Sequence, residues 1–439
     1  MKTFRPLGVL LVVLALVAVA CGDDDETTTT AAGFTPGALG YIEVAPGEPI
    51  EIRALQAISG DVAPLGTDQV RGVELAIADY GDIAGHSVSL GTVEDDGCSA
   101  EGGQAGAQAI IAQLTDAGDG KFTGPLAVIG TTCSGAGRGA LPLLSEAGLV
   151  LISGSNTSPS LTSDLEGTAG EDYLPGYYRT AHNDLFQGGA VARFVYNELG
   201  ITTAAAIHDG DPYTDGLATA FKNTFESLGG TISVYTAVNK GDTDMTAVLT
   251  EVAAGAPEAV FFPIFQPEGD FIIQQAGSVA GLENVTWIGA DGLLGDDFMS
   301  LPESAGMYFS GPDLRFGDNA SQTGKSYSDF LTEYESTYGE APPQVFHAHT
   351  YDATVMVLAA IEAVAFQEED GTLKIDRQAF RDALTATSGF AGMTGSLSCD
   401  AFGDCGAQTI AIVKHEDPSD VAAGKANIVY SEAKGVVSD

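Results

Sequence analysis

The chain has 439 residues, and its 18 basic side chains stand against 60 acidic ones, which gives a formal net charge of −42 at pH 7. A surface with so large an excess of negative charge repels nucleic acid and anionic lipid, so neither is expected as a partner. Hydrophobic residues make up 44% of the chain. This is enough to build a packed core and excludes a wholly disordered protein.

The N-terminus has the composition of an export signal. The apolar run Leu7–Ala20 is too short for an ordinary membrane span and is followed at once by Cys21. We expect residues 1–20 to be a signal peptide ending in a lipobox-like site, where Cys21 is acylated and anchors the exported protein to the outer face of the cell membrane or in the periplasm. The polar, threonine-rich residues 21–47 are expected to form a flexible tether. The alternative is an ordinary secreted protein with a coincidental cysteine.

Beyond the tether, patterns typical of strands and helices alternate along the chain. Strands are expected at 51–58, 86–94, 126–130, 149–153, 202–209, 232–238, 259–265, 285–290, 396–398 and 409–414. Helices are expected at 68–80, 101–114, 137–147, 190–199, 214–228, 245–254, from the end of the 259–265 strand to about 281, and at 326–338 and 350–366. The apolar strands fit burial on both faces of a doubly wound α/β sheet. One core rarely serves a chain of this length, so two lobes are expected.

The segment from Leu126 to Thr162 carries the strongest local signal. Two apolar runs, LAVIG and LVLIS, each end in a loop of glycine and small hydroxyl residues, and a helix-like segment lies between them. This order is typical of a βαβ unit in a parallel sheet. Ligands bind beyond the carboxyl ends of such strands, where loop hydroxyls and the free N–H groups of helix starts point outward. Both loops therefore lie where an anion such as a carboxylate could be held.

Several further motifs stand in a characteristic order and spacing. They are SGDVAPLG (59–66), GVELAIADY (72–80), DDGC (95–98), GTTCSG (130–135), SNTSPSLT (155–162), RTAHNDLFQG (179–188) and YDA (351–353). In these motifs the chain resembles the Leu/Ile/Val-type amino-acid-binding proteins of bacterial ABC transporters, from about Ile50 to past Gly403. The resemblance implies the type I periplasmic-binding-protein fold, with two doubly wound, Rossmann-like lobes joined by a three-segment hinge. Lobe 1 would comprise 48–182 plus 315–394, and lobe 2 would comprise 183–314 plus 395–439.

The resemblance also implies how a zwitterionic amino acid would be held. Ser134 and Thr157 would bind the α-carboxylate, while Ser155 would offer its backbone carbonyl to the ammonium group. Asp291 would supply the negative charge for the ammonium from lobe 2, where the branched-chain binders carry a glutamate. Asp184 aligns with a family aspartate near the ligand amine. The alternatives are structural, because serine and threonine also form caps and turns, and Asp184 could cap the following helix.

The wall around the ligand side chain is implied in the same way. Tyr213 matches a family tyrosine, and Phe265 stands where an aromatic residue is frequent. Leu65 occupies a position where branched-chain binders commonly carry an aromatic ring. An apolar leucine and phenylalanine suit an aliphatic or aromatic ligand side chain, although each residue could equally be part of the core.

Four cysteines remain after Cys21, an even number that fits an oxidising compartment. Cys98 and Cys133 fall in turns after successive strands, where the amino-acid-binding relatives often carry a disulfide. Cys399 and Cys405 flank a hairpin-sized turn. Free thiols are the alternative for each pair. We expect no metal site, because neither pair has a CxxC spacing or a nearby histidine, and no cofactor.

The implied function is binding and not catalysis, since the chain carries no GxSxG, HExxH or P-loop motif. The protein would capture an amino acid, with a branched-chain one as the best candidate, between two closing lobes and deliver it to an ABC permease. The alternative is an amide- or urea-binding lipoprotein, or a ligand-sensing lipoprotein, of the same fold.

Overall fold

The computed structural model describes residues 34–434. The expected signal peptide, Cys21 and the first part of the tether lie outside this range. The predicted end of the tether at residue 47 is wrong, because strand β1 (Tyr41–Val44) pairs with two other strands. Ile42 and Val44 of this strand are buried in the core of lobe 1, while the residues between them are half exposed. Four alternating residues among glycines and prolines gave no clear strand signal in the sequence.

The main sheet of lobe 1 is parallel throughout, as predicted. Its order is β3-β2-β7-β8-β9, with β4 also paired to β2. The strands are β2 (Ile50–Gln56), β3 (Val88–Ser89), β4 (Val93–Asp95), β7 (Ala127–Gly130), β8 (Val150–Ser153) and β9 (Tyr177–Arg179). The single strand predicted at 86–94 is wrong. Gly91 interrupts it with φ of +63°, at a place where a Cβ would lie 2.6 Å from the Arg53 guanidinium.

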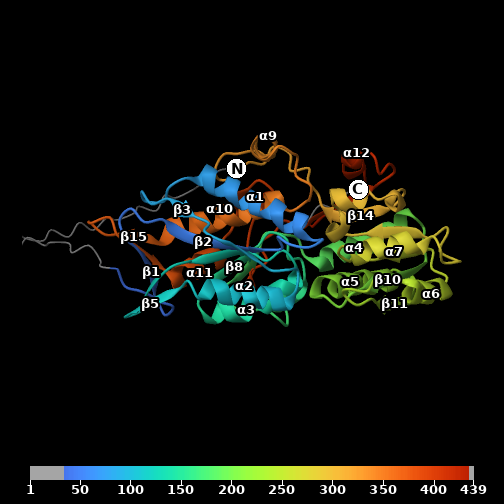
Figure 1. Ribbon diagram of the computed structural model, residues 1–439, viewed down its shortest axis with the longest axis horizontal. Helices are drawn as coiled ribbons and strands as arrows, with labels where there is room; N and C mark the ends of the chain where they lie inside the picture. Colours follow the sequence, from blue (N-terminus) through green and yellow to red (C-terminus); the bar gives the residue numbers. More distant parts are fainter. Residues whose placement is uncertain (1–33, 435–439) are drawn as a thin grey trace, which may run out of the picture. The chain divides into compact units, whose positions relative to one another are not determined.

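Helices cover both faces of this sheet (Figure 1). Helices α1 (Ala63–Tyr80) and α10 (His347–Val364) pack on one face, and α2 (Ala100–Ile111) and α3 (Ser134–Glu146) pack on the other. The alternation along β7 produces this arrangement, because Ile129 points to the core under α1 and α10 while Val128 points to the core under α2 and α3. The uniformly apolar strands seen in the sequence are explained by this burial on both sides.

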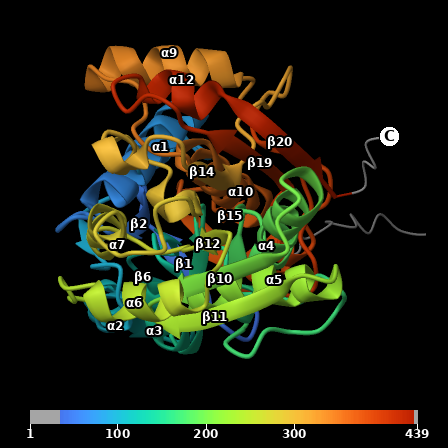
Figure 2. The same cartoon turned by 90° about the vertical axis from the view of Figure 1, so that its right-hand side faces the viewer.

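Lobe 2 repeats the design with an antiparallel extension. Its sheet order is β11-β10-β12-β13-β14-β19-β20, and only the last two pairings are antiparallel. The strands are β10 (Thr203–His208), β11 (Thr231–Ala237), β12 (Ala259–Phe261), β13 (Thr286–Gly289), β14 (Tyr308–Pro312), β19 (Thr409–Lys414) and β20 (Ile428–Ala433). Helices α4 (Asp184–Arg193) and α5 (Pro212–Ser227) pack on one face, and α6 (Thr246–Ala254) and α7 (Glu268–Ala276) on the other (Figure 2).

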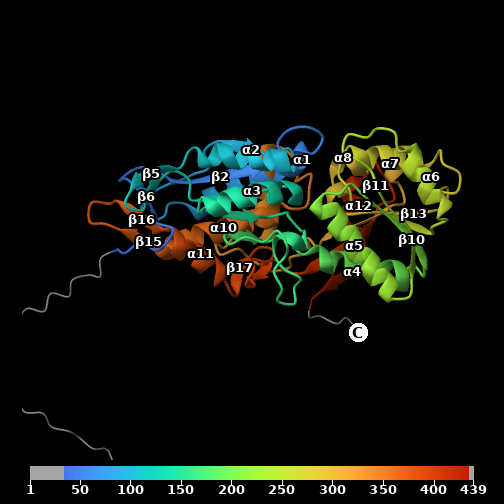
Figure 3. The ribbon, with the colours of Figure 1, turned by 90° about the horizontal axis from the view of Figure 1, so that it is seen from below.

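Two smaller sheets were not predicted. A five-stranded sheet of order β15-β16-β1-β6-β5 lies at the end of lobe 1 away from lobe 2 (Figure 3). Its new members are β5 (Thr115–Gly118), β6 (Lys121–Thr123), β15 (Ala365–Gln367) and β16 (Leu373–Asp376). The second is the hairpin of β17 (Phe390–Gly392) and β18 (Gly395–Leu397). The assignment of 396–398 to lobe 2 is wrong, because Leu397 is buried in the core of lobe 1.

The remaining helices are α8 (Asp296–Met299), α9 (Tyr327–Tyr338), α11 (Arg377–Thr385) and α12 (Val421–Ala426). Within residues 34–434 no helix is long and apolar enough to cross a membrane. The chain passes from lobe 1 to lobe 2 between β9 and α4, returns after β14, and passes over again between residues 405 and 409. The last of these crossings lies about ten residues later than predicted.

Candidate ligand-binding site

The loops that follow six parallel strands meet in one place between the lobes. In lobe 1 the loops after β2, β7 and β8 bring Leu65, Ser134 and Ser155 to this place, and in lobe 2 the loops after β10, β12 and β13 bring Tyr213, Phe265 and Asp291. In lobe 1, β2 lies between β3 and β7, and in lobe 2, β10 lies between β11 and β12, so the sheet extends in both directions from each of these two strands. The carboxyl end of such a strand is the topological switch point, where ligands bind in doubly wound sheets.

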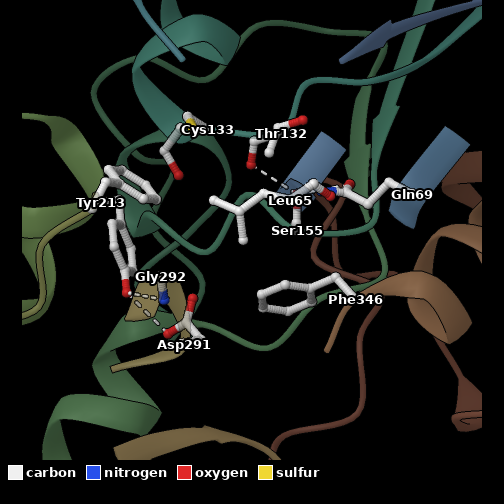
Figure 4. A pocket seen from close by; sticks show the side chains of 11 residues that line it. Leu65, Gln69, Thr132, Cys133, Ser155, Tyr213, Asp291, Gly292 and Phe346 are labelled. Carbon is white, nitrogen blue, oxygen red and sulfur yellow. Dashed lines mark hydrogen bonds between the residues drawn. The ribbon is translucent and has the colours of Figure 1, made fainter. Parts of the chain in front are cut away.

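These loops surround a cavity that is lined by residues of both lobes. Figure 4 shows the side chains that surround it. The lining residues are Leu65, Gln69, Thr132, Cys133, Ser134, Ser155, Tyr213, Phe265, Asp291, Gly292 and Phe346. Six of the eight residues predicted from the sequence are among them. The other two, Thr157 and Asp184, are fully buried and do not line the cavity.

One end of the cavity has the features of an anion site. Ser134 is the first residue of α3, and Cys133 before it caps the helix without a side-chain hydrogen bond. The Ser134 hydroxyl accepts a hydrogen bond from the Ser158 N–H at 3.3 Å. It donates to no other group within the described part of the chain, so its proton is available. The helix start adds unpaired N–H groups and a positive dipole end. The alternative in which Ser134 serves only as a helix cap is therefore wrong.

Ser155 and Thr157 differ in how their hydroxyls are used. The Ser155 hydroxyl has two acceptors within reach of its one proton, the carbonyl of Thr132 at 2.8 Å and Gln69 Oε1 at 2.9 Å, so it is committed within lobe 1. This leaves the backbone carbonyl, the group that the resemblance assigns to the ammonium. The Thr157 hydroxyl is buried and has no hydrogen-bond partner. This hydroxyl lies near enough to the buried Asp184 carboxyl to lower its pKa, and Thr157 does not line the cavity.

The opposite end of the cavity carries Asp291. Its Oδ1 accepts hydrogen bonds from Gln187 Nε2 at 2.7 Å and from the Tyr213 hydroxyl at 3.1 Å (Figure 4). Its Oδ2 has no partner among the described residues, and the residue lines the cavity. Burial raises the pKa of this carboxyl to about 6. Asp291 is thus oriented through one oxygen, and its other oxygen is left without a partner at the cavity.

Asp184 lies close to Asp291. It is fully buried, and neither of its carboxyl oxygens has a hydrogen-bond partner. Burial, and next the charge of Asp291, raises the pKa of Asp184 well above its usual range, while the hydroxyl of Thr157 lowers it. The alternative role as a helix cap is wrong, because Asn183 caps α4 by accepting from the Leu185 N–H at 3.0 Å. The raised pKa favours the protonated form of Asp184, as is usual for one of two carboxyl groups buried close together.

The middle of the cavity is apolar. Leu65 and Phe265 are each 8% exposed, and the Phe265 ring lies 5.0 Å from the Tyr213 ring, centroid to centroid. Phe346, on the segment before α10, completes this wall, although the sequence analysis missed it. Such a wall accepts an apolar group and would leave the polar groups of a hydrophilic side chain without partners.

The other missed residues are of two kinds. Thr132 and Cys133 belong to the GTTCSG motif that also contains Ser134, and Gly292 directly follows Asp291 in the chain. Gln69 lies one helical turn after Leu65 on α1, and the period of the helix could have identified it. Gln187 does not line the cavity but orients Asp291, and it stands inside the RTAHNDLFQG motif that the sequence analysis quoted.

Both predicted disulfides are present, and free thiols are excluded for these four cysteines. The Cys98–Cys133 bond joins the loop after β4 to the loop after β7 and thereby fixes the start of α3 beside Ser134. Lobe 2 contacts this region directly, because Lys240 Nζ donates to the Cys98 carbonyl at 3.1 Å. Within residues 34–434 no three histidine, cysteine or acidic side chains come together as metal ligands.

This fold and this cavity are those of a two-lobed binding protein. The chain matches the model of the family described as periplasmic binding protein over residues 49–416, and it belongs to that family. It is 27% identical to the Leu/Ile/Val-binding protein BraC3 of Rhizobium johnstonii, an alignment that covers 85% of this chain and 94% of the relative. It is 26% identical to the leucine-, isoleucine-, valine-, threonine-, and alanine-binding protein of Pseudomonas aeruginosa, with coverages of 81% and 87%.

Among solved structures, the branched-chain amino acid transporter substrate binding protein LivJ from Streptococcus pneumoniae, in complex with isoleucine, is similar with a TM-score of 0.67. The two sequences are 22% identical, and the match covers 88% of this chain and 99% of that one. The predicted fold class is confirmed. The family is one of binding proteins, which agrees with the prediction that the chain is not an enzyme.

Proposed function

We propose that this protein captures an α-amino acid with an apolar side chain, a branched-chain amino acid in the first place, between its two lobes. The observation that carries this proposal is Asp291, a buried carboxyl group that lines the cavity, with Oδ1 held by Gln187 and Tyr213 and Oδ2 without a partner among the described residues. An ammonium group would bind this free Oδ2 of the ionised Asp291.

The remaining groups fit the rest of such a ligand. Ser134 at the start of α3 would hold the carboxylate, and the unpartnered hydroxyl of Thr157 lies in the neighbouring loop. Leu65, Phe265 and Phe346 would enclose an apolar side chain. The names of the curated relatives support the same ligand class. A neutral amide such as urea is disfavoured, because it would bring no positive charge to the buried carboxylate of Asp291.

The wider role follows from the family. We propose that the closed, loaded protein docks on an ABC permease in the membrane, and that acylated Cys21 keeps it at the outer face of the membrane. A binding protein has to close over its ligand in order to signal loading, and contacts from both lobes to one ligand provide the free energy for closure. The amide-binding and sensing alternatives remain distinct outcomes of the experiment below.

Calorimetric titration of the chain from residue 22 onward tests the proposal. Leucine, isoleucine, valine, phenylalanine, glutamate and urea serve as ligands for the wild-type protein and for Asp291→Asn. We expect saturable binding of a branched-chain amino acid with a free energy of about −8 kcal/mol, which corresponds to a micromolar Kd, and its loss in the variant. Binding of urea with no response to any amino acid would overturn the proposal.

A further inference from the structure

A buried ion pair lies behind the candidate site. Arg179, the last residue of β9, and Asp404 have side chains that are 0% and 2% exposed, and the guanidinium binds Asp404 Oδ2 through Nη2 and, at 3.1 Å, through Nε. The two residues are 225 positions apart in the sequence. Burying two charges costs several kcal/mol per ion before their attraction offsets it. A pair of this kind therefore calls for an explanation beyond stability.

The other side of the Arg179 guanidinium donates hydrogen bonds to the loop that contains Ser155 and Thr157. Its Nη1 donates to the carbonyl of Ser158 at 2.7 Å and to that of Asn156 at 3.4 Å. These two carbonyls flank Thr157, whose hydroxyl has no partner, and they follow Ser155, which lines the cavity. The position of the loop thus depends on the position of Arg179.

Asp404 reaches the second part of the site as well. Its Oδ2 accepts from Asn183 Nδ2 at 3.0 Å and from the Thr162 hydroxyl at 3.1 Å. Asn183 caps α4, and the next residue is Asp184, the buried acid beside Asp291. Thr162 ends the segment that begins at Ser155. One carboxylate therefore contacts the residues that set both the loop and the start of α4.

The loop that carries Asp404 is closed by the second disulfide, Cys399–Cys405. Within the loop, Asp400 Oδ1 accepts from the N–H groups of Phe402 and Asp404 at 2.8 and 2.9 Å. The loop is also paired to β9, since the Arg179 N–H donates to the Gly403 carbonyl at 2.9 Å and the Cys405 N–H donates to the Arg179 carbonyl at 3.0 Å. These bonds hold the Asp404 carboxylate in one place against Arg179.

We infer that Asp404, presented by the disulfide-closed loop 399–405, is a positioning residue for the ligand site. It acts through Arg179 on the loop that contains Ser155 and Thr157, and through Asn183 on Asp184. The inference rests on the proposed function for the identity of the ligand, but the ordering of these two segments does not depend on any ligand.

Hydrogen exchange and calorimetry on the same variants test the inference. The variants are Asp404→Asn and the double substitution Cys399→Ser with Cys405→Ser. The control is Glu432→Gln on the outer strand β20, which breaks the half-buried ion pair between Glu432 and Arg193 of α4. In the ligand-free protein, we expect amides of 155–163 and 180–187 to exchange at least tenfold faster in the first two variants and at the wild-type rate in the control. We expect leucine affinity to fall at least tenfold in the same two variants.

A purely structural role would give a different pattern. Exchange that rises equally throughout lobe 1, or that stays unchanged in the two segments, would overturn the inference. If Asp404→Asn does not fold, the double cysteine variant decides. A wild-type protein that binds no amino acid, combined with exchange confined to the two segments, would contradict the proposed function and support the inference. If the wild-type protein binds leucine and both variants bind it with unchanged affinity, the proposed function is supported and the inference is contradicted.

Discussion

Burial, and next the charge of Asp291, raises the pKa of Asp184 well above its usual range. Asp291 is held on one oxygen by Gln187 and Tyr213 and lines the cavity, whereas Asp184 is fully buried and does not line it. The raised pKa favours the protonated form of Asp184, so Asp291 is the carboxyl group that a bound cation would contact. Four of the predictions below follow from this arrangement and from the cavity around it.

Removing the charge of Asp291 should abolish tight binding. A buried charge pair loses about 2–5 kcal/mol when one partner is truncated, so Asp291→Asn is expected to weaken leucine binding at least 30-fold. Asp291→Glu keeps the charge and should retain measurable affinity. Calorimetry on the three proteins is the measurement. Equal affinity in wild-type and Asp291→Asn would mean that the ammonium is bound elsewhere.

Affinity and stability should respond to pH in opposite directions. The pKa of Asp291 is about 6 in the folded, ligand-free protein, against about 3.9 in an unfolded chain. Between these two pH values the folded state binds more protons at Asp291 than the unfolded state does. The contribution of Asp291 to the free energy of unfolding is therefore fully present below about pH 4 and is lost as the pH rises through about 6. An ammonium ligand needs the ionised form, so leucine affinity should rise over the same interval.

Thermal melts and calorimetry at pH 5 and pH 7.5 measure both effects. About a tenth of Asp291 is ionised at pH 5, which predicts roughly tenfold weaker leucine binding there. Burial also raises the pKa of Asp96 to about 7 and that of Asp352 to about 6, so part of the stability change should persist in Asp291→Asn. An affinity that is the same at both pH values would contradict the role of Asp291 as an ionised acceptor.

Gln187 should matter although it does not touch the cavity. Its amide donates to Asp291 Oδ1 at 2.7 Å and accepts from His182 Nε2 at 2.6 Å, so it joins the first crossing between the lobes to the ammonium site. We expect Gln187→Ala to weaken leucine binding about tenfold, the value of one hydrogen bond to a charged group. Gln378→Ala, on the exposed face of α11, is the control. Unchanged affinity in Gln187→Ala would show that Tyr213 alone orients Asp291.

Lys240 should stabilise the closed arrangement of the lobes. Its Nζ donates to the Cys98 carbonyl in lobe 1 at 3.1 Å and to Asp211 in lobe 2 at 3.2 Å. Lys240 does not itself line the cavity, although its Nζ lies 5.9 Å from the centroid of the Phe265 ring. Lys240→Ala removes the interlobe bond, so the ligand-free protein should be more open in small-angle scattering and should bind leucine about fivefold more weakly. Lys222→Ala is the matched control, since Lys222 lies over the Tyr235 ring in lobe 2. Identical scattering of both variants would exclude the role.

The motifs predicted the site better than the sequence patterns predicted the fold. Each of Ser134, Ser155, Tyr213, Phe265 and Asp291 follows a parallel strand, and the carboxyl ends of such strands meet whatever the exact strand limits are. The order of motifs was therefore enough to place these residues at one cavity. Asp184 and Thr157 were predicted to bind the ligand, but both are fully buried and do not line the cavity, so their direct contact with a ligand stays a prediction.

What could not be predicted depends on long-range packing. Phe346 reaches the cavity from a segment just before α10, and no local pattern tells which way that segment turns. Arg179 and Asp404 are 225 positions apart in the sequence. Their pairing could be predicted only from the path that the chain takes through the third crossing. The five-stranded sheet consists of strands of three or four residues, too short to show a period. In each case tertiary contacts decided the outcome.

Leu65 should set the preference among apolar ligands. It lines the cavity opposite Phe346 and is 8% exposed, so Leu65→Ala removes contact with the ligand side chain and opens space beside it. Because a lost methylene contact in such a pocket costs about 1–3 kcal/mol, leucine binding should weaken at least tenfold, and phenylalanine should gain relative to leucine. Calorimetry with leucine, valine and phenylalanine measures the ratios, with Leu185→Ala on the exposed surface of α4 as the control. An unchanged ratio of phenylalanine to leucine affinity would mean that the ligand side chain points away from Leu65, toward Phe265.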